Sequence, residues 1–105
     1  MIQHIDESNI SQFLASPNSN VLLTFGAAWC GPCKALEPAL EKVLSQYPNI
    51  KAGKVDVEES PSLADKYSVR GLPKMILFKK QEYVAERTGF CSEKQLSDFL
   101  AMGQN

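Results

Sequence analysis

The sequence contains little of several residue types, and these scarcities exclude whole classes of protein. It holds three cysteines, one histidine and one tryptophan among 105 residues. An odd and small number of cysteines does not suit a disulfide framework. Lysine and arginine total 11 against 12 aspartate and glutamate residues, so there is neither a basic excess nor an acidic tail. Without a basic excess to hold a phosphate backbone, nucleic acid is not expected as a partner.

Long apolar runs are also missing. No stretch approaches the ~18 apolar residues needed to cross a bilayer, so no contact with a membrane is expected. Residues 1–8 lack a basic region followed by an apolar run, which argues against a signal peptide and favours a cytoplasmic location, where thiols stay reduced. Hydrophobic residues make up 44% of the chain and charged residues 22%, which predicts one globular domain over residues 1–105.

Apolar patterning predicts strands and helices that alternate. Residues 21–25 form a near-continuous apolar run, which is typical of a central strand covered on both faces. The expected elements, in chain order, are a strand at 2–5, a helix at 10–14, a strand at 21–25, a helix through 36–47, a strand at 50–57, a helix at 61–67, strands at 75–78 and 83–88 joined by a tight turn, and a helix after Ser92. This β-α-β-α-β-α-β-β-α order predicts an α/β fold, with a mixed sheet of four to five strands and helices on both faces.

Local signals mark where the helices begin. Ser60 followed by Pro61 is typical of a cap with proline at the first helical position. Ser92, with Gln95 three residues later, predicts a capping box. Pro38 lies inside the longest helix, where its missing N–H predicts a kink.

The run from Trp29 to Cys33 carries the candidate chemistry. Its two cysteines follow the predicted central strand and stand where a helix is expected to begin. The free N–H groups of a helix start favour an anion, here the thiolate of Cys30 exposed at that end. Gly31 and Pro32 suit the tight entry to the helix. Cys33 lies one turn further and can expel a product from a mixed disulfide, so the motif predicts thiol–disulfide exchange with Cys30 as nucleophile and Cys33 as resolving thiol.

Other roles for the cysteines and the histidine are weaker. Zinc usually takes four ligands, and beyond the pair only Cys91 and His4 remain as cysteine or histidine candidates, so no metal is expected. His4 is interpreted as a surface residue. Cys91 is interpreted as a small, partly buried hydrophobe, with a regulatory thiol near Gly89 as the alternative.

The run from Trp29 to Lys34 resembles the active-site motif of the thioredoxin family. The similarity covers nearly the whole chain and includes Pro38, residues 54–56, 70–73 and 78–80, and Gly89. It implies a thioredoxin fold and reduction of protein disulfides without a bound cofactor. It further implies a monomeric electron carrier in cell redox homeostasis, with thioredoxin reductase and NADPH as the electron source and disulfide-containing proteins as clients.

The resemblance also implies a substrate groove. The Leu72–Pro73 bond is expected to be cis, although only about 5–6% of X–Pro bonds in folded proteins are. This loop is expected to meet the cysteines and pair its backbone with a client strand, which makes Leu72 and Pro73 substrate-binding residues. Gly89 is expected to line the same groove. Trp29 is expected to shape the client surface, with a plain core position as the alternative.

One residue beneath the motif departs from the family pattern, and this changes what is expected of another. Thr24 stands where the family usually has a buried aspartate that helps to deprotonate the resolving cysteine. Threonine cannot act as a base, so Cys33 is expected to resolve mixed disulfides more slowly. Lys54 matches the lysine that usually pairs with that aspartate. It is expected to be unpaired, with its charge favouring the thiolate of a nearby cysteine.

Further departures concern recognition and the last hairpin. Gly26 replaces a common aromatic residue, which predicts a more open wall of the site. Lys74, together with Lys34 and Arg70, predicts a positive reactive face that favours acidic partners. Gln81 replaces the usual glycine of the hairpin turn, which predicts strain or a different turn type.

Two other functions fit the same residues. A disulfide oxidant or isomerase would use the same cysteines, but Gly31 and Pro32 between them argue against it. A redox-regulated adaptor, with weak general reductase activity, would keep the dithiol as a vestigial or regulatory feature. The absence of a base at Thr24 keeps that alternative open.

Overall fold

The computed structural model describes residues 2–15 and 20–103. The elements follow the predicted order. They are β1 (Ile2–Ile5), α1 (Ile10–Leu14), β2 (Asn20–Gly26), α2 (Gly31–Leu44), β3 (Ile50–Asp56), α3 (Pro61–Lys66), β4 (Lys74–Lys79), β5 (Glu82–Thr88) and α4 (Glu93–Ala101). β2 and β4 each extend one residue beyond the predicted bounds at both ends, because backbone pairing continues past the apolar side chains. Within the described residues, no helix is long and apolar enough to cross a membrane.

The five strands form one mixed sheet in the order β1-β3-β2-β4-β5. β3 runs parallel to both β1 and β2, whereas β4 runs antiparallel to β2 and to β5. The predicted α/β fold is therefore confirmed, as a single domain. β2, which leads into the two cysteines, lies in the middle of the sheet and is held by backbone pairing on both sides.

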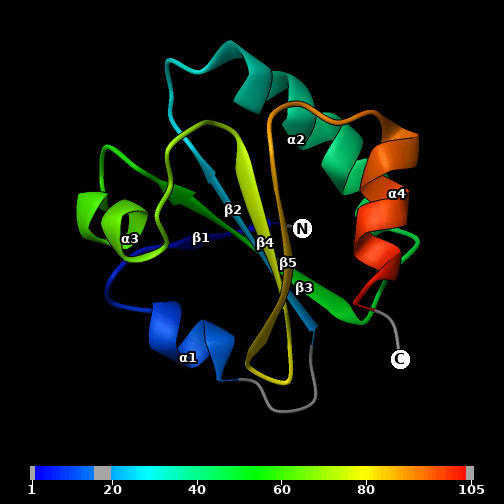
Figure 1. Ribbon diagram of the computed structural model, residues 1–105, viewed down its shortest axis with the longest axis horizontal. Helices are drawn as coiled ribbons and strands as arrows, with labels where there is room; N and C mark the ends of the chain where they lie inside the picture. The colour runs from blue at the N-terminus through cyan, green and yellow to red at the C-terminus, as the bar shows by residue number, and fades with distance from the viewer. Residues whose placement is uncertain (1, 16–19, 104–105) are drawn as a thin grey trace.

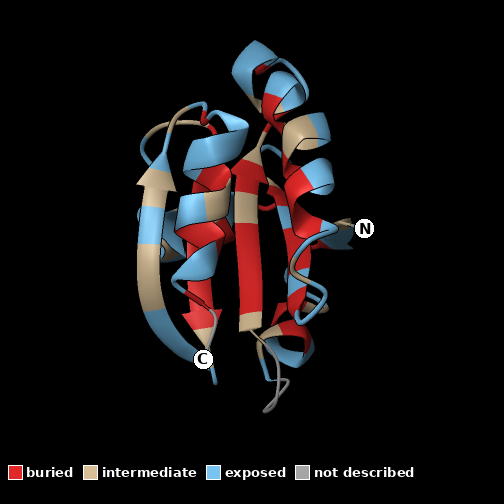
Figure 2. Cartoon of the chain, turned by 90° about the vertical axis from the view of Figure 1, so that its right-hand side faces the viewer, coloured by how far each residue is buried: buried red, intermediate tan, exposed pale blue. Residues whose placement is uncertain are grey.

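Helices cover both faces of the sheet, α2 and α4 on one side and α1 and α3 on the other (Figure 1). The central strands are buried along most of their length (Figure 2). Alternation along β2 divides its side chains between the two faces. Leu22 packs in the core beneath α2 and α4, whereas Leu23 and Phe25 pack in the core beneath α1 and α3. Thr24 therefore shares the face of Leu22 and lies on the α2 side.

The predicted helix starts are present, with one difference. Ser92 and Gln95 form the reciprocal capping box. Ser60 and Pro61 occupy the cap and the first position of α3, but the Ser60 hydroxyl donates to Glu7 Oε1 at 3.0 Å instead of capping the helix. A nearby carboxylate is the stronger acceptor for a buried hydroxyl. α2 continues through Pro38 as one helix, and the kink stays a prediction.

The hairpin between β4 and β5 turns on two residues with left-handed backbone. Lys80 has φ of 52° and Gln81 has φ of 70°. Positive φ at both central residues is the conformation of a type I′ turn, which asparagine and glycine adopt most readily. The predicted strain at Gln81 therefore has a structural basis, since its Cβ crowds the backbone there. The Gln81 side-chain amide also donates to the carbonyl of Ala15 at 3.3 Å.

Candidate active site

Cys30 and Cys33 are joined in a disulfide at the start of α2, with their Cα atoms 5.3 Å apart. Cys30 is the N-cap residue of the 14-residue helix, and its sulfur accepts a hydrogen bond from the Cys33 N–H at 3.3 Å. A sulfur thus occupies the place that a serine or aspartate oxygen takes at most helix starts. Pro32 lies in the first turn, where its missing N–H leaves no backbone partner unsatisfied.

The exposure of Cys30 differs from the prediction. Cys30 was expected to be exposed at the helix end, but only 5% of its surface is accessible, whereas Cys33 is half-buried. The turn closed by the Cys30 N–H and the Ala27 carbonyl, at 3.1 Å, folds Cys30 inward. Gly26 has no side chain to cover Cys33.

The loop of residues 70–73 lies beside the two cysteines. Leu72 lines a cavity with Trp29 and Cys30, whereas Pro73 lines a different cavity with Cys33. The Leu72–Pro73 bond is cis, as expected. The Gly89 N–H donates to the Pro73 carbonyl at 2.8 Å, so Gly89 lies directly behind the loop with a φ of 99°. These predicted groove residues are therefore close together, although Gly89 lines neither cavity.

Trp29 is 68% exposed, so its alternative as a core residue is wrong. Its indole Nε1–H donates to Glu58 Oε2 at 3.3 Å, which links the motif to the loop between β3 and α3. Glu58 could not be recognised from the sequence, because 29 residues separate it from Trp29 and no local signal marks it.

The cavity beside Cys33 has a volume of about 380 Å³ and is lined by Thr24, Gly26, Cys33 and Lys54 among others. A Cβ atom added at Gly26 would lie 3.2 Å from Cys33 Sγ. Gly26 therefore lies close against Cys33, and the more open wall stays a prediction. Thr24 lies on the α2 side of β2 and lines the same cavity as Cys33, so a base at this position would adjoin Cys33.

Comparison with known proteins identifies the family to which this site belongs. A sequence profile of the thioredoxin family matches residues 1–102. The chain belongs to the thioredoxin family. The thioredoxin of Buchnera aphidicola subsp. Schizaphis graminum is 41% identical over 100 residues, covering 94% of this chain and 93% of that protein. The thioredoxin of Chlamydia trachomatis serovar D is 36% identical, covering 99% of this chain and all of the relative.

A solved structure has the same architecture as this thioredoxin-family chain. Chloroplastic thioredoxin z superposes with a TM-score of 0.85 at 27% identity, covering 95% of this chain and 91% of that one. Family, fold and the Cys30–Cys33 disulfide together make the chain a protein-disulfide oxidoreductase that works by dithiol–disulfide exchange. Its clients are disulfide-containing proteins.

Lys54 corrects one expectation drawn from the thioredoxin pattern. It was expected to be unpaired, but its ammonium donates to both carboxylate oxygens of Glu37, at 2.9 and 3.2 Å. Glu37 stands on α2 four residues after Cys33, so it lies on the same helix face and points at β3. It supplies the negative charge that the missing aspartate would have given. Its i+4 spacing from Cys33 is the signal that could have identified it.

Lys74 corrects a second expectation, because it does not belong to a positive reactive face. Its side chain is 6% exposed and forms an ion pair with Glu86 Oε2 at 3.2 Å. Its ammonium also donates to the backbone carbonyls of Tyr67 and Ser68 at 3.4 Å. Lys34 and Arg70 are exposed. A buried ammonium is tolerated where hydrogen-bond partners replace its water, and here a carboxylate and two carbonyls do so.

Cys91 is fully buried, and the Arg87 Nε–H donates to its sulfur at 2.8 Å. Oxidation of a thiol requires access as well as thiolate character. The structure therefore favours the interpretation of Cys91 as a small buried residue over that of a regulatory thiol at the groove rim.

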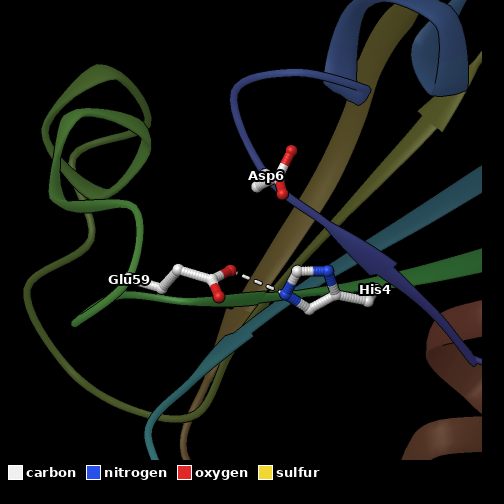
Figure 3. A group of neighbouring side chains, drawn as sticks. All are labelled: His4, Asp6 and Glu59. Carbon is white, nitrogen blue, oxygen red and sulfur yellow. Dashed lines mark hydrogen bonds and ion pairs between the residues drawn. The ribbon is translucent and has the colours of Figure 1, made fainter.

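A polar cluster of His4, Asp6 and Glu59 brings ligand-type atoms within 4.8 Å of one another (Figure 3). His4 is exposed, as predicted, and its Nε2 lies 2.6 Å from Glu59 Oε1. The Asp6 carboxylate accepts hydrogen bonds from the N–H and hydroxyl of Ser8, which lower its pKa. His4 and Glu59 thus partner each other and Asp6 partners the adjacent turn, and the group contains neither Cys30 nor Cys33.

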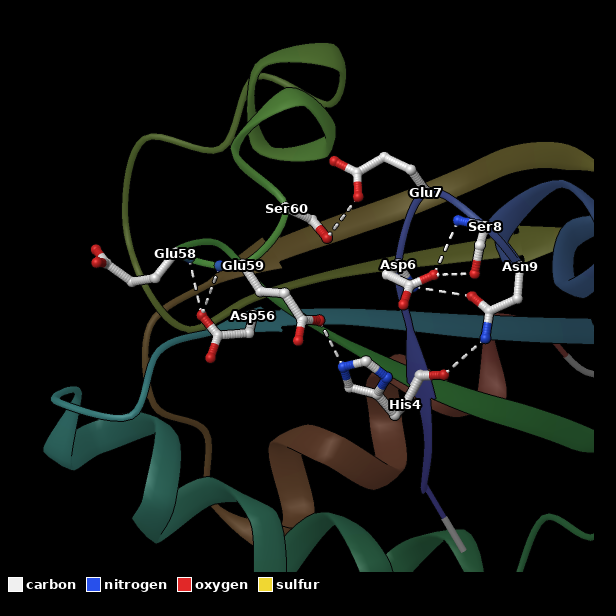
Figure 4. Close-up of polar contacts among 9 residues, drawn as sticks. All are labelled: His4, Asp6, Glu7, Ser8, Asn9, Asp56, Glu58, Glu59 and Ser60. Carbon is white, nitrogen blue, oxygen red and sulfur yellow. Dashed lines mark hydrogen bonds and ion pairs between the residues drawn. The ribbon is translucent and has the colours of Figure 1, made fainter.

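On the same surface, side-chain hydrogen bonds connect α3 to the turn after β1 (Figure 4). Glu7 accepts hydrogen bonds from Ser60 at 3.0 Å and from Ser62 at 2.5 Å. The bond from Ser62 is the main cause that lowers the pKa of Glu7 below its ordinary value of 4.5. These contacts fix the helix that follows the Trp29 partner Glu58.

Proposed function

We propose that Cys30 attacks client disulfides and that Cys33 resolves the mixed disulfide. The observation that supports this order is the hydrogen bond from the Cys33 N–H to Cys30 Sγ at the cap of α2. A donor aimed at the sulfur and the positive end of a 14-residue helix both favour the thiolate, which is the attacking form.

The exchange balances in two steps. The Cys30 thiolate attacks one client sulfur, so a Cys30–client disulfide forms and the other client sulfur leaves as a thiolate that takes up a proton. Cys33 then loses its proton and attacks Cys30, which releases the second client thiol. The products are two client thiols and the Cys30–Cys33 disulfide.

We assign client binding to the surface around the disulfide. Exposed Trp29 supplies a rigid apolar contact beside Cys30. Leu72 and Pro73 offer a backbone edge to an extended client segment, as in strand addition, and Gly89 fixes that loop from behind. Gly31 and Pro32 keep the helix entry tight and small enough for a client to approach.

Electrons would come from NADPH through thioredoxin reductase, with no cofactor or metal bound to this chain. We further propose that the domain spans residues 1–105 and works as a cytoplasmic monomer in electron transport for redox homeostasis. Sedimentation of the reduced protein should give one species of 11.6 kDa. A stable dimer would contradict this assignment.

NADPH consumption with thioredoxin reductase and insulin tests the function. The wild-type chain should turn over rapidly, and Cys30→Ser should abolish turnover because the attacking sulfur is gone. Cys91→Ala is the matched control, since that buried cysteine lies outside the exchange pair and its loss should leave turnover near wild type. Absence of wild-type turnover, with a dithiol that still reacts chemically, would refute the reductase assignment and indicate a different reductant or a dedicated partner.

A trapping experiment separates a general reductase from an adaptor. Cys33→Ser should retain clients through disulfides to Cys30, because the mixed disulfide cannot be resolved. Several captured proteins that a reducing agent releases would support the proposal. A single partner that survives the reducing agent would favour the adaptor.

A further inference from the structure

Glu37 is the first acidic residue of α2, and it stands one helical turn after Cys33. Side chains four residues apart lie on the same face of a helix, with their Cβ atoms about 5–6 Å from each other. Helical side chains also lean toward the N-terminus, so Glu37 leans over the turn that carries Cys33. Both residues line the cavity of about 380 Å³ described above. The Glu37 carboxylate is therefore close enough for its charge to act on the Cys33 sulfur.

Lys54 brings the opposite charge to the same cavity from β3. It pairs in register with Thr24 of β2, so its side chain leaves the sheet on the α2 side. The Lys54 ammonium donates to the two carboxylate oxygens of Glu37 at 2.9 and 3.2 Å. Charges of opposite sign thus act on Cys33 together, and each offsets the effect of the other.

The other charged or titratable side chains that line this cavity are His4, Lys34 and Asp56. His4 Nε2 lies 2.6 Å from Glu59 Oε1, and Asp56 Oδ1 accepts a backbone N–H of the following loop at 2.8 Å. Lys34 is exposed and directly follows Cys33, so its side chain points about 100° away around the helix. Of the charges that line the cavity, those of the ion pair between α2 and β3 are thus the best placed to act on the sulfur.

We propose that Glu37 offsets the charge of Lys54 and so keeps Cys33 in its thiol form while Cys30 ionises. An ammonium near a thiol favours the thiolate, and a carboxylate disfavours it. Lys54 without Glu37 would favour a second anion beside the Cys30 thiolate. Both oxygens of Glu37 accept from Lys54, so Glu37 acts by its charge and does not take the Cys33 proton. This inference rests on the proposed function, in which Cys30 attacks and Cys33 resolves.

Titration of Cys33 as a single thiol tests the two charges separately. The background is the reduced chain with Cys30→Ser and Cys91→Ala, in which Cys33 is the one remaining cysteine. Ultraviolet absorbance of the thiolate follows its ionisation. Glu37→Gln should shift the titration midpoint down by at least about 0.5 pH unit, and Lys54→Met should shift it up by at least about 0.5 pH unit.

The opposite signs distinguish an effect of charge from one of structure. If the ion pair only held α2 against β3, its loss would affect Glu37→Gln and Lys54→Met alike. Glu41→Gln is the matched control, because it removes an exposed carboxylate one turn further along α2, and it should shift the midpoint by less than about 0.2 pH unit. Circular dichroism checks that each variant is folded. Shifts of the same sign in the two test variants, no shift in either, or an equal shift in Glu41→Gln would overturn the proposal.

The chain with both active-site thiols connects this ionisation to catalysis, on the Cys91→Ala background. The reduced protein releases one thionitrobenzoate when Cys30 attacks dithiobis(nitrobenzoate), and a second one when Cys33 resolves the mixed disulfide at a rate independent of reagent concentration. In Glu37→Gln the second release should be about twofold faster at pH 7. A midpoint lower by about 0.5 pH unit triples the thiolate, whereas its lower basicity removes part of its nucleophilicity.

The two releases also separate this inference from the proposed function. A second release that is slower or unchanged in Glu37→Gln would overturn the inference. Absence of a second release in the chain with native Glu37 would instead refute Cys33 as the resolving thiol, and the titration would still decide whether Glu37 controls the ionisation of Cys33.

Discussion

Thr24 is the residue at which the chain departs most from the chemistry of its family. It is half-buried beside Cys33 and Lys54, so a carboxylate introduced there would adjoin the resolving thiol. Thr24→Asp should speed turnover several-fold, because a base near Cys33 promotes its deprotonation. It should also lower the free energy of unfolding by about 1–3 kcal/mol, since a charged group loses hydration.

The NADPH-coupled assay and urea denaturation measure these two effects of Thr24→Asp. Thr24→Asn is the matched control, because it has the same size as aspartate and no base. Turnover that stays unchanged in Thr24→Asp, or rises equally in Thr24→Asn, would show that Cys33 resolution does not limit the rate.

Gln81 offers a residue-level test of backbone strain. Gln81→Gly should raise the free energy of unfolding by about 1 kcal/mol, because glycine adopts a φ of 70° without crowding its own backbone. Gln81→Ala keeps the Cβ and loses only the amide contact to Ala15, so it should not stabilise the protein. Thermal denaturation of both variants provides the measurement. Equal effects of the two substitutions would contradict the strain argument.

At the level of elements, the tie between Glu7 and α3 should be sensitive to pH. Hydrogen bonds from Ser62 and Ser60 lower the folded-state pKa of Glu7, so the folded protein binds fewer protons there than the unfolded chain. The stabilisation is therefore complete above about pH 4.5 and is lost as pH falls through the lower folded-state pKa.

Glu7→Gln should accordingly weaken the loss of stability between pH 7 and pH 3, as measured by urea denaturation at several pH values. Ser62→Ala removes the main cause of the lowered pKa of Glu7. This substitution should likewise weaken the loss of stability between pH 7 and pH 3. A pH dependence identical to wild type in both variants would show that the tie contributes nothing to acid stability.

At the level of the whole molecule, the two core clusters lie on opposite faces of one sheet and share the strands β2, β3 and β4. Neither face can lose its packing without exposing those strands, so we expect one cooperative unfolding transition. The single Trp29 reports on the active site and far-ultraviolet circular dichroism reports on the helices. Their urea transitions should coincide, and a separated Trp29 transition would indicate that the active-site end unfolds independently.

The order of the elements was predictable because it follows from periodicity along the chain, and the capping box at Ser92 needs only the residues nearest to it. The cis bond before Pro73 was predictable from the family resemblance alone. The pairing of Lys54 with Glu37 and the burial of Lys74 could not be predicted from the sequence, because each depends on contacts between side chains of different elements. The exposure of Cys33 likewise depends on how α2 packs over Gly26.

The sheet order also has a consequence for the newborn protein. Pro73 is synthesised 40 residues after Cys33, and the neighbour of β2 in the sheet, β4, follows it. At about 5–20 residues per second, synthesis of the loop that lies beside the two thiols follows theirs by roughly 2–8 s. During that interval the nascent chain carries a dithiol without this loop, so we expect its thiols to react with oxidants less selectively than those of the folded protein.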